Sequence, residues 1–283
     1  MLGKALAALP FLVVMMAVVV DLQHLTARTL PLLARLYTLP AALPVVAAAQ
    51  EAFINRTVAA MGAAVNDTAL QGAACWALGR VAARAHNSDA LRARARVAAA
   101  GGVQRVLEAM GNHSHVPAVQ HAGAWALMHL AHREENQLAI AGMGGIERLL
   151  EALQAHASHA ALLQAATGAL GNVAVNPSTQ VRIATLGGIE RVLAGMHAHR
   201  ADEESQRQGC FALMTIADNV AGNQARVTAG GGVGLILDAL AAHASSASLS
   251  KYACWSLAIL AEGHRATQDA IVGQVCVCVE VCV

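Results

Sequence analysis

Histidine recurs in this 283-residue sequence at intervals that could bring several imidazoles together, and imidazole is a common ligand of transition metals. Each occurrence comes a few residues after an apolar segment, at His113, His115, His156, His159, His197, His199 and His243. If these turns stacked along one edge about 10 Å apart, the imidazoles could form a metal-binding stripe. A repeated linker with histidine as a polar turn residue explains the same spacing. The sequence favours this second interpretation, and we expect no metal site.

Cysteine also recurs in register. Cys75, Cys210 and Cys254 each precede the aromatic position of a similar apolar segment, where Ala124 and Thr167 fill the same place in other copies. A position shared by cysteine, alanine and threonine is typical of a small buried core residue. Residues so far apart in a repeat array do not form a disulfide framework, which agrees with a reducing compartment.

Other patterns that could perform chemistry are incomplete. The glycine run at 230–232 has no preceding strand and no following lysine–serine pair, as a phosphate-binding loop would require. Cys276, Cys278 and Cys282 in the C-terminal VCVCVEVCV are too few for a metal site. No paired carboxylates and no Ser, His and Asp set stand apart from the repeat. We therefore expect a protein that is not an enzyme and needs no cofactor.

Composition excludes one class of partner. Nineteen basic and 18 acidic residues give a formal net charge of +1, and 56% of the residues are hydrophobic, mostly alanine. Nonspecific binding to nucleic acid needs a strong basic field, which this balance does not supply. No nucleic-acid partner is expected.

An internal repeat of about 43 residues organises the chain. A leucine marker recurs at Leu78, Leu127, Leu170, Leu213 and Leu257. A glycine pair before an apolar residue recurs at Gly101-Gly102, Gly144-Gly145, Gly187-Gly188 and Gly231-Gly232. A third marker, the apolar residue four before each pair, keeps the same phase. A period of this size is the signature of stacked helical repeats.

Each copy predicts three helices. The helix that carries the leucine marker has an apolar stripe at helical spacing, and a short helix follows and ends at the glycine pair, where the chain can turn sharply. After the turn, Ile146, Leu149, Leu150 and Leu153 lie on one face of a further helix. One copy cannot bury these stripes alone, so neighbouring copies must stack into a continuous core.

The repeat resembles the armadillo repeat. Its third helix often reads W-A-L-x-N-L-A, and the segments here read CWALGRVA, AWALMHLA, TGALGNVA, CFALMTIA and CWSLAILA. The resemblance covers roughly residues 52–274 and implies an all-α fold, a right-handed α-solenoid of three-helix armadillo-like repeats. The two-helix HEAT repeat is the nearest alternative, but it lacks the glycine turn.

In armadillo arrays the third helices line a concave groove, which implies three rungs of groove residues here. The first rung is Trp76, Trp125, Gly168, Phe211 and Trp255, the second is Arg80, His129, Asn172, Thr215 and Ile259, and the third is Gly72, His121, Gln164, Arg207 and Lys251. Importins pair tryptophan with asparagine one turn later, and no copy here has both. Because the rungs contain three cationic side chains and no acid, we expect the groove to bind an extended neutral-to-acidic protein segment. Alternatively, some tryptophans simply cover the seam between repeats.

The chain divides into three regions: an apolar N-terminal segment at 1–51, the repeat array at 52–274 and a Val/Cys tail at 275–283. Sixteen uncharged residues between Lys4 and Asp21 fit a signal peptide, a short anchor or an organelle-targeting segment. A degenerate capping repeat or an incorrect gene start is the alternative. The expectation is a cytoplasmic scaffold. A membrane-associated or organellar adaptor that uses residues 1–20, or a regulatory fragment of a longer protein, remains an alternative, and an uncapped end would favour self-association.

Overall fold

The computed structural model describes residues 26–31, 44–83, 88–262, 265, 268–269 and 271–272, and within them it is helical with no strand. The segment predicted for targeting at residues 1–20 and the Val/Cys tail at 275–283 lie outside these residues. The chain forms two compact units, unit 1 (Met1–Ala139) and unit 2 (Ile140–Val283).

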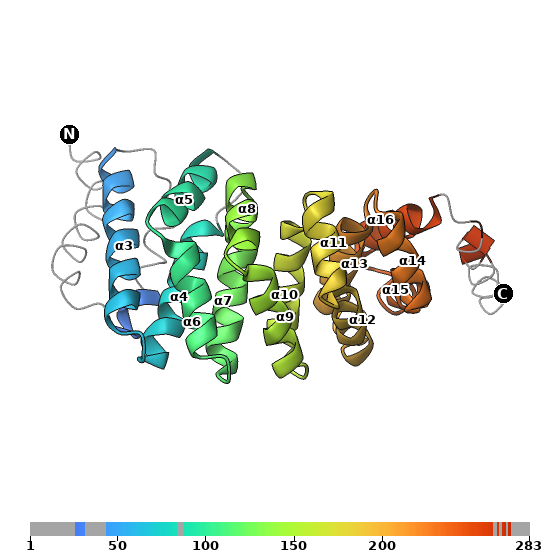
Figure 1. Ribbon diagram of the computed structural model, residues 1–283, viewed down its shortest axis with the longest axis horizontal. Helices are drawn as coiled ribbons and strands as arrows, with labels where there is room; N and C mark the ends of the chain where they lie inside the picture. Colours follow the sequence, from blue (N-terminus) through green and yellow to red (C-terminus); the bar gives the residue numbers. More distant parts are fainter. Residues whose placement is uncertain are drawn as a thin grey trace, which may run out of the picture. The chain divides into compact units, whose positions relative to one another are not determined.

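Unit 1 contains one partial and one complete three-helix repeat, which follow one another in chain order in Figure 1. The helices of the unit are α3 (Pro44–Ala63), α4 (Thr68–Ala82), α5 (Ser88–Ala99), α6 (Gly102–Asn112) and α7 (Pro117–Leu130), and α8 (Glu134–Gly142) crosses into unit 2. Helix α3 begins eight residues before Ala52, so the predicted start of the array at residue 52 lies inside a helix. The third helices α4 and α7 pack against each other.

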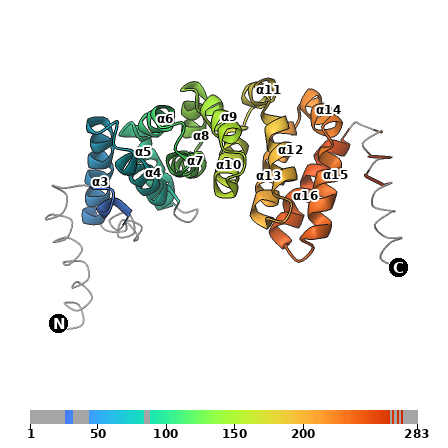
Figure 2. The same cartoon turned by 90° about the horizontal axis from the view of Figure 1, so that it is seen from below.

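Unit 2 continues the same order of helices, as the labels in Figure 2 show. After the end of α8 come α9 (Gly145–Ala155), α10 (Ala160–Val173), α11 (Pro177–Thr185), α12 (Gly188–Ala198), α13 (Glu203–Ala217), α14 (Ala221–Ala229), α15 (Gly232–Ala242) and α16 (Ala247–Ala261). Here α13 packs between the third helices α10 and α16. The predicted all-α solenoid of three-helix, armadillo-like repeats is thus confirmed.

Both glycines of each pair are required, for different reasons. Gly144 has φ +82°, a left-handed conformation that side-chain-bearing residues rarely adopt, and Gly101, Gly187 and Gly231 have the same conformation. At Gly145 a Cβ would lie 2.7 Å from the carbonyl oxygen of Ile140, which is closer than van der Waals contact allows. The pair therefore joins a first helix to a second helix by one residue with positive φ and one that approaches the preceding helix end.

The apolar stripes form the core as predicted. Ile146, Leu149, Leu150 and Leu153 on α9 are all buried, as are the leucine markers from Leu78 to Leu257. Burying an aliphatic side chain of this size contributes about 1.5–3 kcal/mol relative to leaving it in water, so the stripes supply the main stabilisation of the array.

Helix starts are fixed locally. Asp67 accepts a hydrogen bond from the backbone N–H of Leu70 at 2.9 Å, and Asp202 accepts one from Ser205 at 2.9 Å. Because these carboxylates bind N–H groups that have no partner inside the helix, they fix where the third helices α4 and α13 begin.

Candidate binding groove

In unit 1 the predicted groove residues form a cluster of aromatic rings on α4 and α7. Trp76 and Trp125 stack with ring centroids 4.0 Å apart and an interplanar angle of 25°. His129 meets Trp125 edge-on at 4.6 Å, and His121 lies 6.0 Å from Trp76. All four side chains are half-buried. The structure therefore brings these predicted residues together and leaves part of each ring accessible.

Gly79 is the reason that Trp125 can lie against α4. A Cβ at Gly79 would be 2.6 Å from Cε3 of Trp125 and 2.9 Å from the Cα of Ala126. Trp125 consequently serves two purposes, since one part of the ring fills the seam between α4 and α7 while the rest is exposed. The interpretation that some tryptophans cover the seam between repeats therefore applies to this residue, and the role of its exposed part in binding stays a prediction.

Arg80 supplies the positive charge of this cluster. It lies in the last turn of α4 and is half-buried. Within the described part of the chain, no hydrogen bond or ion pair engages its guanidinium. A cation at a helix C-terminus is favoured by the helix dipole, and its five N–H donors remain available for a carboxylate.

In unit 2, by contrast, predicted groove residues bind acidic neighbours. Arg207 pairs with Glu204 through both carboxylate oxygens, at 2.7 Å from Nε and 2.5 Å from Nη2. The hydrogen bond that Arg207 donates to Glu204 raises the pKa of Arg207 against the opposing effect of burial. Burial opposes ionisation of Glu204, but the hydrogen bonds from Arg207 and Gln208 outweigh it and lower the pKa of this carboxyl. The positive charge of Arg207 is thus largely balanced by the carboxylate of Glu204.

Gln164 is held in the same way, because its amide donates to Asp202 at 2.7 Å. Burial opposes ionisation of Asp202, but hydrogen bonds from Ser205 and Gln164 lower its pKa overall. Asp202 and Glu204 lie outside the three predicted rungs. Although the rungs contain no acid, these two carboxylates make the surface of this part of unit 2 partly acidic.

Tyr252 joins the groove residues of α13 and α16, although the sequence analysis did not select it. Its ring meets Phe211 edge-on at 5.3 Å, and it lies 5.8 Å from the guanidinium carbon of Arg207 and 5.5 Å from Nζ of Lys251. A cation over an aromatic face at this distance is attracted by the ring. The signal that could have identified Tyr252 is an aromatic residue directly after Lys251 on the same helix.

The remaining predicted residues differ in what they offer. Thr215 places its hydroxyl 3.1 Å from the carbonyl oxygen of Ala212 on its own helix, and Asn172 is half-buried. Trp255 is 53% exposed, whereas Ile259 is 7% exposed and belongs to the core. Trp255 is therefore the most accessible tryptophan of the predicted set.

One prediction about the cysteines is wrong. Cys75 and Cys210 are fully buried, and burial raises the pKa of both thiols to about 12, so they are unreactive core residues. Cys254 is exposed. Its counterpart Cys210 lies on α13, which α16 covers, whereas no further third helix covers α16 within the described residues.

Three of the recurring histidines lie in turns and connect one repeat to the previous one, whereas His197 lies in α12 and His159 caps the start of α10. His113 Nε2 lies 2.8 Å from the carbonyl oxygen of Val65, and His199 and His243 make equivalent bonds to Ala157 at 3.1 Å and Arg200 at 3.0 Å. A carbonyl oxygen only accepts, so Nε2 carries the proton in each case. In the described residues no three His, Cys, Asp or Glu side chains converge as metal ligands would.

Buried glutamines were missed altogether. Gln71, Gln120 and Gln206 are each 2% exposed and occupy one repeat position. The Gln120 amide donates to the carbonyl oxygens of Met110 at 2.7 Å and His113 at 3.0 Å, at the C-terminal end of α6. The other two do the same for α3 and α12. Their recurrence at one period was the signal in the sequence.

No single helix in the described part of the chain is long and apolar enough to cross a membrane, although α14 and α15, joined at a bend of 69°, reach that length and apolarity together.

Known proteins resemble this chain in structure only. The crystal structure of an engineered protein from the Northeast Structural Genomics Consortium superposes with a TM-score of 0.68 and 24% identity, over 84% of this chain and 89% of that chain. A chain from a study of the phosphorylation switch that controls the interaction between cadherin and beta-catenin gives a TM-score of 0.46 and 14% identity, over 82% of this chain and 62% of that chain. No family model matches the sequence, and the search of curated proteins found no match. The first likeness supports the fold described above and carries no assignment of function.

Proposed function

We propose that this chain is a noncatalytic armadillo-type scaffold that binds an extended, neutral-to-acidic segment of a partner protein along its third helices. The observation that carries the proposal is the half-buried cluster of Trp76, Trp125, His121 and His129 beside Arg80. Aromatic faces cover apolar parts of a bound chain, and the polar groups beside them bind its backbone and charged side chains.

The charges of the two units favour binding of the acidic part of the ligand at unit 1. Unit 1 contains 11 basic and 7 acidic residues, and unit 2 contains 8 basic and 11 acidic residues. Arg80 has no acidic partner in the described residues, whereas Arg207 in unit 2 is paired with Glu204. Carboxylates of the ligand should therefore bind at Arg80, and the segment that binds α13 and α16 should be neutral.

Fluorescence anisotropy with labelled 12-residue peptides tests the proposal. An acidic peptide with leucine or tyrosine at alternate positions is compared with a peptide in which lysine replaces each acid. The acidic peptide should bind more tightly, and Arg80→Glu should weaken it about tenfold, because an attractive contact becomes a repulsive one. Arg92→Glu on α5 is the matched control, since it makes the same charge change at an exposed site outside α4 and α7. Tighter binding of the lysine peptide would contradict the proposal.

A further inference from the structure

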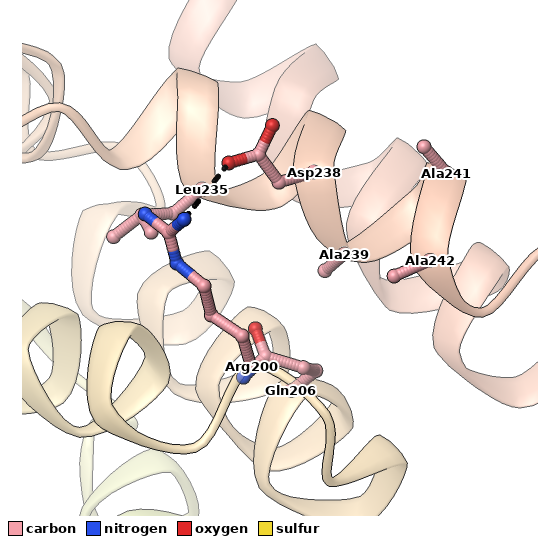
Figure 3. A pocket seen from close by; sticks show the side chains of 7 residues that line it. All are labelled: Arg200, Gln206, Leu235, Asp238, Ala239, Ala241 and Ala242. Atoms are coloured by element: carbon pink, nitrogen blue, oxygen red, sulfur yellow. Dashed lines mark ion pairs between the residues drawn. The ribbon is translucent and has the colours of Figure 1, made fainter.

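A pocket of about 500 Å³ opens in unit 2, apart from the predicted groove residues. Its walls come from Arg200 in the turn after α12, Gln206 on α13, and Leu235, Asp238 and three alanines on α15. Figure 3 shows Arg200 reaching from the turn towards Asp238, with Leu235 beside the guanidinium. The volume lies in the range of natural ligand sites, and the small apolar side chains leave the space open.

The preceding repeat of unit 2 fills the corresponding space with a leucine. Leu163 on α10 occupies the repeat position of Gln206, and Gly195 on α12 occupies that of Ala239. Leu163 packs so closely on Gly195 that a Cβ at Gly195 would overlap the leucine methyl groups. In the next repeat the Gln206 amide is instead committed to the carbonyl oxygens of Met196 and His199, at 2.8 and 2.9 Å. Glutamine is the residue that other repeats carry at this position, and Leu163 is the exception, so the space that Leu163 fills is left open beside Gln206.

A departure from the repeat on α15 lies at the same place. The position of Leu235 is arginine in the other second helices, and Arg148 pairs with Glu151 on its own helix at 2.8 Å. With leucine there, Asp238 has no such partner on α15 and instead faces Arg200 at 4.0 Å, with 54% and 64% of the Arg200 and Asp238 side chains exposed. An exposed ion pair at this separation contributes little to the stability of the fold, so a ligand can break it at a small cost in free energy.

From the open space beside Gln206 and the leucine at position 235 we propose that the pocket binds one leucine-like side chain of an extended segment in a partner protein. The side chain enters between Leu235 and the α15 alanines, where Leu163 lies in the preceding repeat. The backbone of the same residue has one N–H donor and one C=O acceptor. The N–H donates to the Asp238 carboxylate and the C=O accepts from the Arg200 guanidinium, so the charges at the rim complement the peptide unit.

Selection from a random peptide library displayed on phage, with the full chain as the target, tests this proposal. Selected peptides are then measured against Ala242→Phe, which fills the mouth of the pocket with a ring. Ala198→Phe is the matched control, because Ala198 is the exposed residue at the same repeat position on α12 and does not line the pocket. Thermal unfolding of both variants verifies that each is folded.

The proposal expects a family of peptides that loses at least tenfold in affinity on Ala242→Phe and keeps its affinity on Ala198→Phe. These peptides should share one leucine, isoleucine or methionine whose replacement by alanine abolishes binding. Asp238→Asn and Arg200→Gln should each weaken them severalfold, and Arg80→Glu in the groove should leave them unchanged. Enrichment of peptides that bind all variants equally, or failure to enrich any family that is sensitive to Ala242→Phe, would overturn it.

Discussion

Trp125 in unit 1 and Trp255 in unit 2 occupy the same position of the repeat but have different surroundings. Trp125 is half-buried, stacks on Trp76 and lies against Gly79, whereas Trp255 is 53% exposed. At the place on α13 that corresponds to Gly79 the residue is Met214. Phe211 follows the Trp125 arrangement, because it lies against Gly171. Whether an aromatic residue of the third helix is a seam residue or a surface residue therefore depends on the residue in the preceding repeat.

The prediction with the largest expected effect compares the loss of stability in Trp125→Ala with that in Trp255→Ala. Loss of Trp125 removes the stacked ring and leaves a cavity over Gly79, and should cost about 3 kcal/mol. Loss of the exposed Trp255 should cost less than about 1 kcal/mol. Urea unfolding followed by circular dichroism measures both. Equal losses would show that exposure does not distinguish the two tryptophans. Because Trp125→Ala is expected to destabilise the fold, it is not a suitable variant for binding experiments.

Gly79→Ala tests the glycine itself. The added Cβ would lie 2.9 Å from the Cα of Ala126, so α7 must move away from α4, and overpacking of this kind should cost about 2 kcal/mol. Gly222→Ala on α14 is the control, because nothing lies within 4 Å of its Cβ and helix propensity alone should stabilise it. The fluorescence of Trp76 and Trp125, recorded in a Trp255→Phe background, follows unit 1. An unchanged urea midpoint for Gly79→Ala would contradict the packing argument.

The third prediction compares two buried threonines. The Thr167 hydroxyl in unit 2 is buried with no hydrogen-bond partner among the described residues, whereas Thr57 in unit 1 donates to the carbonyl oxygen of Phe53 at 2.8 Å. Thr167→Cys, which introduces the residue that Cys75 and Cys210 supply in other repeats, should raise stability by about 1 kcal/mol. Thr57→Cys should not. Differential scanning calorimetry of both variants decides, and a lower melting temperature for Thr167→Cys would refute the prediction.

A smaller effect concerns the ion pairs between repeats in unit 2. Arg182 pairs with Glu147 at 2.6 Å and Arg226 with Glu190 at 2.5 Å, at equivalent repeat positions. In unit 1 the residue that corresponds to Glu147 is Gln104, which bonds within its own helix. Because both pairs are partly exposed, Arg226→Gln should cost about 0.5 kcal/mol, and the loss should disappear in 1 M salt. Urea midpoints at low and high salt measure it; a loss that persists in salt would indicate packing rather than charge.

The last prediction concerns stability at acid pH. Asp202 and Glu204 in unit 2 have lowered pKa values, so the folded unit binds fewer protons than the unfolded chain. The stability that they contribute is present above their unfolded pKa values of about 4 and is lost as the pH falls below them. The double variant Asp202→Asn, Glu204→Gln should therefore lose less stability between pH 6 and pH 3 than the parent chain. Urea midpoints at the two pH values test this, and equal losses would count against it.

The repeat itself was predictable because its markers are apolar residues, which indicate buried positions, and glycines, which indicate an unusual backbone conformation. The leucine markers are buried, and Gly101, Gly144, Gly187 and Gly231 have the positive φ that the glycine turn requires. The three-helix order therefore follows from the sequence. The additional eight residues at the start of α3 could not be foreseen, since the alanine-rich segment there carries no marker of the repeat.

The site was less predictable because the role of a polar side chain depends on the groups that it binds, and the sequence does not show which groups these are. Repeat position alone selects Trp76, Arg80, Trp125 and the two histidines beside them, and their role in binding stays a prediction. The predicted groove positions lie four residues apart on each helix and so leave out Glu204, which binds Arg207 from three residues away, and the sequence of a glutamine does not show whether its side chain is buried. The burial of Cys254 was wrongly predicted because it depends on coverage by another helix.

The hydrogen bonds from His199 to Ala157, from His243 to Arg200 and from Asn223 to Gln180 join residues 42 or 43 positions apart, within one residue of the repeat period. Duplication of a whole repeat would therefore give every donor an acceptor at the same spacing. Insertion of a few residues within a helix would shift donor and acceptor relative to each other and leave a carbonyl without its partner. The longer linker before α5, by contrast, still allows His113 to bond with Val65, 48 positions earlier. Chains of this kind should lengthen by gene segments of one full period, and shorter insertions should be confined to the linkers, such as the longer one before α5.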